Sequence, residues 1–249
     1  MAIIVENITF KSNNLSLKGR IYRPVKEEKK PAVAICHGYP GNTKNMDLAE
    51  ELAFNGIVAL VFYYQGAWGS EGIYRFSNLI PSTVDAVSYL KSLSYVDPTR
   101  VGLVSHSMGA IPLTNVMSRD KTIKTGVLIS PASDISKWLT KEVLDNIFPI
   151  FLGIAEGKLA YGDGKEYKKD MSKVASDLNP MDIVASIEAP IMIIAASADN
   201  LAPPEDSKAL YEKATSIKKW VLIDGADHDF NDHRVVLQKK VLEWLRENL

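Results

Sequence analysis

Ser107 follows an apolar run and has a small residue two positions before it and another two positions after it. The run 101–105 has the composition of a buried strand, and the helical pattern of 108–118 follows the serine at once. A sharp strand–turn–helix brings the strand so close to the helix that only small side chains fit at Ser105 and Gly109. Such a turn presents the hydroxyl at the carboxyl edge of the sheet, beside a helix N-terminus that stabilises negative charge. The stretch therefore predicts a nucleophilic serine.

A serine hydroxyl attacks only with the help of a base, and that base needs a third group to hold it. Two later strand-like runs, 191–196 and 220–223, are each followed by a loop that carries a suitable side chain. The first loop carries Asp199 and the second carries His228. Because the carboxyl ends of parallel strands meet at one edge of a sheet, these side chains can converge on Ser107. The sequence therefore predicts a catalytic Ser–His–Asp triad.

Three other carboxylates compete with Asp199 for the role of the acid. Asp134 follows the strand-like run before the one that leads to Asp199, and it is the strongest rival. Asp227 and Asp229 adjoin His228, but chain geometry does not let them orient the far nitrogen of its ring. Asp199 is therefore the favoured acid, and Asp134 remains the alternative.

The remaining histidines and the single cysteine are interpreted as structural. One histidine precedes a glycine-rich loop, one lies inside the serine turn, and one belongs to the last helical pattern; the cysteine lies in an apolar run. No histidine or carboxylate cluster has the spacing of metal ligands, and no phosphate-binding glycine motif is present. We therefore expect no metal and no cofactor, and structural roles for His37, His106, His233 and Cys36.

Four pieces of the chain together resemble the α/β-hydrolase family over essentially its whole length. "SHSMG" resembles the nucleophile elbow, "SADNLAPP" the acid loop, "GADHDF" the histidine loop and "CHGYPGN" the oxyanion loop. The elbow departs from the G-x-S-x-G pattern because Ser105 replaces the first glycine. The resemblance implies an oxyanion hole formed by the backbone N–H groups of Tyr39 and Met108. It is closest to small esterases with an inserted cap, such as cinnamoyl or feruloyl esterases and monoacylglycerol lipases.

The resemblance implies acyl transfer to water through an acyl-enzyme. We expect a carboxylesterase that acts on small to medium esters with apolar or aromatic groups. The same core also occurs in acylaminoacyl and dipeptidyl peptidases, so a serine peptidase remains an alternative. A binding protein without activity on the same fold is a further alternative. Four aromatic residues near the expected mouth are candidates for substrate binding: Trp68, Trp138, Phe148 and Phe151.

The wider pattern predicts an α/β fold with a mostly parallel sheet covered by helices on both faces. Two alternating runs at the N-terminus, 3–10 and 15–23, are typical of an antiparallel hairpin. The later apolar runs are continuous, as in strands that are buried on both faces. Amphipathic helical patterns separate them, which indicates right-handed crossovers. These strand-like runs are 32–36, 57–64, 101–105, 125–130, 191–196 and 220–223.

One long segment, 134–187, interrupts this alternation of strands and helices. It contains no convincing strand and carries several apolar helical faces. A segment of this length inside a compact domain is usually a functional insertion, and we interpret it as a small helical cap. The core then comprises 1–133 and 188–249, and the Gly/Lys-rich stretch 157–169 is expected to form a mobile outer turn of the cap. An ordinary crossover helix with an extended loop is the alternative.

Composition and charge give no support to several classes of partner. The 249 residues are 46% hydrophobic, and 29 basic against 30 acidic residues give a net charge of −1. This balance does not favour nucleic acid or an anionic membrane. No signal peptide or membrane-spanning run is recognised, so a cytoplasmic protein is expected. The expected partner is a small-molecule ester, and a homodimer remains open.

Overall fold

A single eight-stranded sheet forms the centre of the molecule. The structure is a computed structural model that describes residues 2–25, 28–140 and 142–249. The strand order is β1-β2-β4-β3-β5-β6-β7-β8, with β1 antiparallel to β2, β2 antiparallel to β4, and all later pairs parallel. The strands are β1 (Ile3–Ser12), β2 (Leu15–Pro24), β3 (Lys30–Cys36), β4 (Val58–Phe62), β5 (Val96–His106), β6 (Gly126–Ile129), β7 (Ile191–Ala196) and β8 (Lys218–Ile223).

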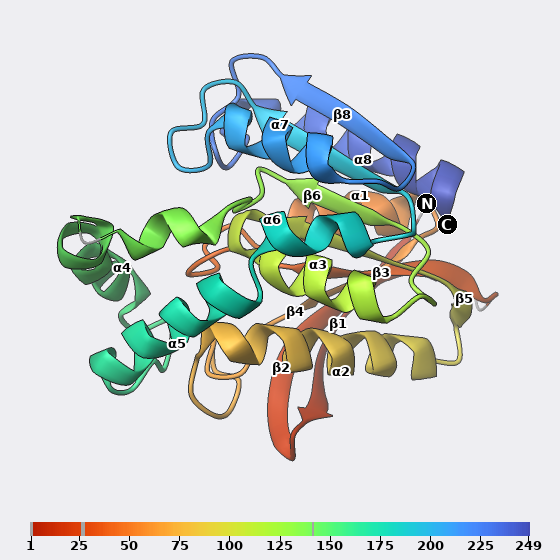
Figure 1. Cartoon of the computed structure of the whole chain (residues 1–249). Helices are drawn as coiled ribbons and strands as arrows, with labels where there is room; N and C mark the ends of the chain where they lie inside the picture. Colours follow the sequence, from red (N-terminus) through yellow and green to blue (C-terminus); the bar gives the residue numbers. More distant parts are fainter. Residues whose placement is uncertain (1, 26–27, 141) are drawn as a thin grey trace.

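Helices cover both faces of the sheet (Figure 1). The central parallel strands consist almost wholly of buried residues, because each face packs against its own hydrophobic core. One core includes α2 (Leu79–Ser92), α3 (Ala110–Arg119) and α7 (Pro204–Lys213), and the other includes α1 (Met46–Phe54) and α8 (Arg234–Asn248). The α/β fold expected from the sequence is confirmed. In the described part of the chain, no helix is long and apolar enough to cross a membrane.

The strand before Ser107 begins earlier than its apolar run. β5 starts at Val96, which pairs with Lys30, and the register of this pairing shifts between Lys30 and Ala32. Residues 98–100 are exposed and include a proline, so the sequence of this part of the strand has no apolar residues that would predict a strand. The extension lengthens the strand at the end away from the serine turn and does not alter the position of Ser107.

The segment between β6 and β7 is helical, as expected from the sequence. Its two longest helices lie beyond one end of the sheet, at the left of Figure 1. We refer to residues 134–187 as the inserted segment. It comprises η3 (Ile135–Leu139), the π-helix η4 (Val143–Ile147), α4 (Phe148–Ala155), α5 (Gly164–Asp177), α6 (Pro180–Ile183) and η5 (Val184–Ser186).

The outer part of the inserted segment is attached to the core, and residues 157–169 do not form the outer turn that the sequence predicted. The N–H of Trp68 donates to the carbonyl of Lys158 at 2.8 Å, and the N–H of Ala160 donates to the carbonyl of Gly66 at 2.7 Å. The N–H of Tyr74 donates to the carbonyl of Ala160 at 2.8 Å. The stretch thus pairs with the loop that follows β4.

The second half of the same stretch belongs to a helix. α5 begins at Gly164, and the carboxylate of Asp163 caps it by accepting from the N–H groups of Lys165 and Glu166. Tyr167 and Met171 lie on the buried face of this helix. The lysines of the stretch lie on its other faces, and this is why a run rich in charge can belong to a packed helix.

Candidate active site

Ser107 lies in a tight turn between β5 and α3. It is the first residue of the short 3₁₀ turn η2 (Ser107–Gly109) and has a φ of 53°, in the left-handed region that is unfavourable for a residue with a side chain. Ser105 is fully buried below it. A Cβ atom on Gly109 would lie only 2.3 Å from the carbonyl oxygen of Cys36. The small residues on both sides of the serine therefore allow α3 to pack directly against β3.

Asp199 and His228 form a hydrogen-bonded pair at the carboxyl edge of the sheet. Nδ1 of His228 lies 2.8 Å from Oδ2 of Asp199, whose side chain is fully buried, while the imidazole is 14% exposed. The other carboxylate oxygen accepts from the N–H groups of Leu201 and Ala202, at 2.9 and 2.8 Å. Because a carboxylate only accepts, His228 donates from Nδ1, and its Nε2 keeps a free lone pair.

The charge of Asp199 is maintained by its hydrogen bonds. Burial acts to raise the pKa of this carboxyl, but the hydrogen bonds from His228 and from the backbone of Ala202 outweigh burial and lower the pKa below its ordinary 3.8. Asp199 is therefore ionised at neutral pH. An ionised partner fixes the tautomer and the orientation of the imidazole.

The rival carboxylates are engaged elsewhere. Asp134 accepts from the N–H and hydroxyl of Ser136 and from the amide of Asn179, and so it caps η3. Asp227 accepts from the backbone and side chain of Asn231. Of these carboxylates, the hydrogen bond to the His228 ring belongs to Asp199, the acid favoured from the sequence.

The glycine-rich loop after β3 lies against the serine turn. A Cβ atom on Gly38 would lie 3.0 Å from Cβ of Ser107, so this glycine permits the close approach. The backbone N–H groups of Tyr39 and Met108 make no hydrogen bond to a loop or a side chain among the described residues. Both residues line the same cavity as Ser107, and their role as the oxyanion hole stays a prediction.

Trp68 and His37 support this loop from below. The indole N–H of Trp68 donates to the carbonyl of Pro40 at 2.8 Å, and Nδ1 of the buried His37 donates to the carbonyl of Gly38 at 2.7 Å. Burial lowers the pKa of His37 to about 4, so its ring is neutral at pH 7. Trp68, predicted to bind substrate, is not among the residues that line the cavity beside Ser107.

His106 holds the backbone of the histidine loop. Its Nε2 lies 2.8 Å from the carbonyl oxygen of His228, so it donates there, and the two rings lie 4.9 Å apart. Burial lowers the pKa of His106 to about 4, with a further contribution from His228. A neutral His106 therefore acts as a structural donor beside the His228 ring, a contact that the sequence did not indicate.

An open cavity of about 330 Å³ brings the predicted residues together. Ser107, His228 and the glycine-rich loop form one side of it. Trp138 of η3 and Phe151 of α4 form the other side, so the inserted segment lies over Ser107. The hydroxyl of Tyr39 reinforces this contact by donating to the carbonyl of Phe151 at 2.8 Å.

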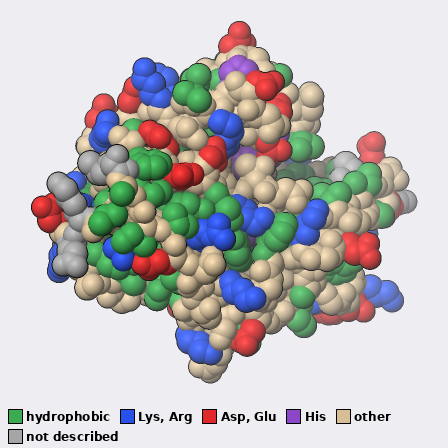
Figure 2. Space-filling model, turned by 180° about the vertical axis from the view of Figure 1, so that it is seen from behind, with side chains coloured by type: hydrophobic (Ala, Val, Ile, Leu, Met, Phe, Trp, Pro, Cys, Tyr) green, Lys and Arg blue, Asp and Glu red, His purple; other side chains and the backbone are tan. Residues whose placement is uncertain are grey.

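Sequence reasoning missed three apolar residues at the mouth of the open cavity. Ile150 and Ile154 on α4 are 62% and 43% exposed, and Leu201 in the acid loop is 76% exposed. Figure 2 shows hydrophobic side chains gathered on the lobe at its right, the side of the molecule on which α4 lies. The spacing of Ile150 and Ile154 by four residues indicated a shared helical face, but not which surface that face borders.

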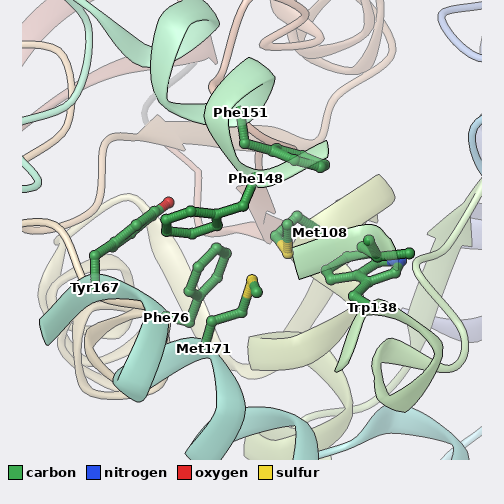
Figure 3. Close-up of a pocket in the computed structure, with 8 residues that line it drawn as sticks. Phe76, Met108, Trp138, Phe148, Phe151, Tyr167 and Met171 are labelled. Carbon is green, nitrogen blue, oxygen red and sulfur yellow. The ribbon is translucent and has the colours of Figure 1, made fainter. Parts of the chain in front are cut away.

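A small inner pocket of about 10 Å³ adjoins the open cavity. Figure 3 shows the side chains that line it. Phe148, predicted to bind substrate, lines this pocket and not the open cavity. Three side chains line both spaces and so separate them: Met108, Trp138 and Phe151. Among the described residues, no group of three or more His, Cys, Asp or Glu side chains could hold a metal ion.

The sheet order, the elbow and the Asp199–His228 pair define an α/β hydrolase. Residues 67–249 match the model of the prolyl oligopeptidase family, and the chain belongs to that family. The chain is also 26% identical over 222 residues to the uncharacterized protein Rv2307c of Mycobacterium tuberculosis. The aligned region covers 88% of this chain and 69% of that protein.

Solved structures share the fold at low sequence identity. Est1E from Butyrivibrio proteoclasticus with bound ferulic acid superposes with a TM-score of 0.79 at 21% identity, covering 97% of this chain and 98% of that one. DcsB in complex with its substrate analogue superposes with a TM-score of 0.79 at 18% identity, covering 98% of this chain and 99% of that one. Fold and family together make the protein a hydrolase.

Proposed function

We propose that the protein is a serine carboxylesterase in which Ser107 is the nucleophile, His228 the general base and Asp199 the residue that orients the base. One observation carries the proposal. His228, whose Nδ1 lies 2.8 Å from the buried Asp199, lines the same cavity as Ser107, and the positive φ of Ser107 is typical of a nucleophile elbow. An Asp–His pair that served only stability would not have to lie at the cavity that contains Ser107, a serine with an unfavourable backbone conformation.

The geometry supports a two-step acyl transfer. Nε2 of His228 takes the hydroxyl proton as Oγ of Ser107 attacks the ester carbonyl, and the imidazolium is stabilised by Asp199. The N–H groups of Tyr39 and Met108 donate to the tetrahedral oxyanion. The intermediate then expels the alcohol, which takes the proton from His228. Water, deprotonated by His228, attacks the acyl-enzyme, and His228 returns this proton to Oγ of Ser107 as the acyl–oxygen bond breaks and the acid leaves.

The proposed substrates are small to medium esters with an apolar or aromatic group. The open cavity has the volume of a small ligand, and Trp138, Phe151 and Ile150 give it an apolar wall. The inserted segment then acts as a cap that selects substrates by shape, with residues 1–133 and 188–249 as the catalytic core. Ferulic acid bound to the structurally similar Est1E is a ligand of this aromatic kind.

A serine peptidase is the second candidate, because the chain belongs to the prolyl oligopeptidase family. The cavity favours esters over peptides with a free N-terminus. Asp229 is the one carboxylate side chain that lines the open cavity in the described part of the chain, and it accepts a hydrogen bond from Thr43. A substrate ammonium group would therefore find this single carboxylate as its counter-charge, opposite the apolar wall formed by Trp138 and Phe151.

Labelling and turnover test the proposal together. A fluorophosphonate probe should form an adduct on Ser107, located by mass spectrometry, and Ser107→Ala should abolish labelling and lower kcat by orders of magnitude while the fold is retained. Aryl esters of increasing chain length should be hydrolysed in preference to aminoacyl anilides. Labelling of another serine contradicts the assignment, an unlabelled folded protein favours a binding protein, and preference for anilides favours the peptidase.

A further inference from the structure

The loop that carries His228 and the loop that carries Tyr39 are far apart in the chain but joined at the open cavity. Asp229, directly after His228, accepts a hydrogen bond of 2.6 Å from the hydroxyl of Thr43 in the glycine-rich loop. Both residues line the cavity. The contact connects the proposed base to the proposed oxyanion donor through side chains that do not themselves react.

Arg234 makes a second connection between the same loops. It is the first residue of α8, and its Nη1 donates to the backbone carbonyl of Asp229 at 3.2 Å. Its Nη2 donates to the side-chain oxygen of Asn45, whose side chain is buried, at 2.9 Å. Nε and Nη2 also donate to the two carboxylate oxygens of Asp47, at 2.7 and 2.6 Å. One guanidinium thus contacts the histidine loop, the end of the glycine-rich loop and the first turn of α1.

The fork of Arg234 is held rigidly. Its side chain is only 20% exposed, and Asp47 also accepts from the amide of Gln238 at 2.8 Å. A bidentate guanidinium–carboxylate pair fixes direction as well as distance, and the single ammonium of a lysine cannot reproduce it. Asp47 of α1 thus orients the guanidinium of Arg234, and the guanidinium in turn fixes the position of the Asp229 carbonyl and of the backbone next to His228.

We propose that Arg234 and Thr43 are positioning residues that hold the histidine loop and the oxyanion loop as one unit. This inference rests on the proposed function, since it assigns the two loops to the same reaction. Base and oxyanion donors act at the same moment in the transition state, so their relative position limits the chemical step. Substrate binding depends mainly on the apolar wall across the cavity, and loosening the unit should therefore affect kcat more than KM.

Thr43 provides the sharper test, because its substitution changes one hydrogen bond. Thr43→Val keeps the shape but removes the donor, and we expect kcat for an aryl ester to fall about tenfold with KM nearly unchanged. Thr43→Ser restores the hydroxyl and should recover most of kcat. If Thr43→Val and Thr43→Ser both behave like the wild type, or if KM rises while kcat is retained, the positioning role is wrong.

Arg234 is tested against a matched arginine on the same helix. Arg234→Lys keeps the charge but loses the fork, and kcat should fall at least about tenfold. Arg246, near the other end of α8, donates to the side-chain oxygen of Asn55 at 2.7 Å, and Arg246→Met should leave kcat unchanged. Equal effects of the two substitutions would overturn the proposal.

The wild-type protein separates a failure of this inference from a failure of the proposed function. If wild-type Ser107 does not react with the fluorophosphonate probe, the esterase assignment fails and the positioning role fails with it. If wild-type Ser107 reacts and the Thr43→Val variant reacts at the same rate, only the positioning role fails. Circular dichroism of each variant establishes that the fold is retained, and Thr43→Val keeps the test valid if Arg234→Lys unfolds.

Discussion

At the scale of single residues, the site depends on two hydrogen bonds of His228, one made by its ring and one by its backbone carbonyl. Nδ1 of His228 is committed to Asp199, and the backbone carbonyl of His228 accepts from His106. Both the ring and the loop that carries it are therefore fixed before any substrate arrives. Preorganisation of this kind lowers the cost of reaching the transition state.

Replacing the two candidate acids by asparagine should lower kcat strongly in one case and leave it nearly unchanged in the other. Asp199→Asn changes the ionised acceptor into an amide and favours the wrong imidazole tautomer, so kcat should fall roughly 10³–10⁴-fold. Asp134→Asn leaves an oxygen that can still cap η3, and kcat should stay within about twofold. Steady-state hydrolysis of an aryl ester measures both. The reverse ranking would assign the acid to the loop after β6.

The residues of the proposed triad were candidates from the sequence because each follows a strong strand signal. Ser107, Asp199 and His228 lie just beyond apolar runs, and topology alone brings such positions to one edge of the sheet. The location of Trp68 could not be predicted in this way. Its indole points to Pro40 because of the local path of a loop with positive φ at Trp68, which no periodicity encodes.

At the scale of elements, the close contact between β3 and α3 determines where the serine lies. Gly109→Ala would place a methyl group against the Cys36 carbonyl, where a Cβ atom comes within 2.3 Å. We expect a loss of stability of roughly 1–3 kcal/mol and lower activity, because the turn must shift. Urea unfolding and ester hydrolysis measure the two effects.

Gly153 provides a matched control within another helix. It lies in α4, and a Cβ atom there would have no neighbour within 4 Å. Gly153→Ala should therefore stabilise the protein by about 0.5–1 kcal/mol, through helix propensity alone. If both alanine substitutions destabilised the protein equally, the close packing at Gly109 would not be the cause.

The inserted segment shows which features of an element a sequence can predict. Its helical character was predictable from apolar residues spaced three and four apart, and α5 fits this pattern through Tyr167 and Met171. Its attachment to the core was not. The hydrogen bonds between Lys158, Ala160 and the loop at Gly66 join backbone groups, and backbone pairing between distant loops leaves no mark on side-chain composition.

At the scale of the whole molecule, two buried histidines make stability depend on pH. The folded protein keeps His37 and His106 neutral down to about pH 4, whereas an ordinary histidine titrates near 6.5. Between these pH values the unfolded chain binds more protons than the folded protein. The contribution of the two histidines to the free energy of unfolding is therefore fully present above pH 6.5 and is lost as the pH falls towards 4. Two protons give a steepest slope of about 2.7 kcal/mol per pH unit.

Urea unfolding at several pH values measures this slope. His106→Asn removes one of the two protons but leaves an amide that can donate to the His228 carbonyl, so the slope should fall by about half. The lowered pKa of Asp199 adds a further loss only at more acidic pH, as that carboxylate takes up a proton. An unchanged slope in the His106→Asn variant would mean that His106 is not the group responsible.

The pairing of Ala160 with Gly66 and Tyr74 divides the inserted segment into parts with different local opening free energies. The amides of Trp68, Tyr74 and Ala160 can exchange with solvent only when this pairing breaks, so they should share the slow exchange of the sheet. α4 has two large apolar side chains in contact with solvent and should open at lower cost. Hydrogen–deuterium exchange should thus divide the segment between Ala155 and Lys158, and uniform protection along it would contradict this. We therefore expect α4 to lose its protection first, while the backbone pairing at Ala160 still holds the rest of the stretch to the loop after β4.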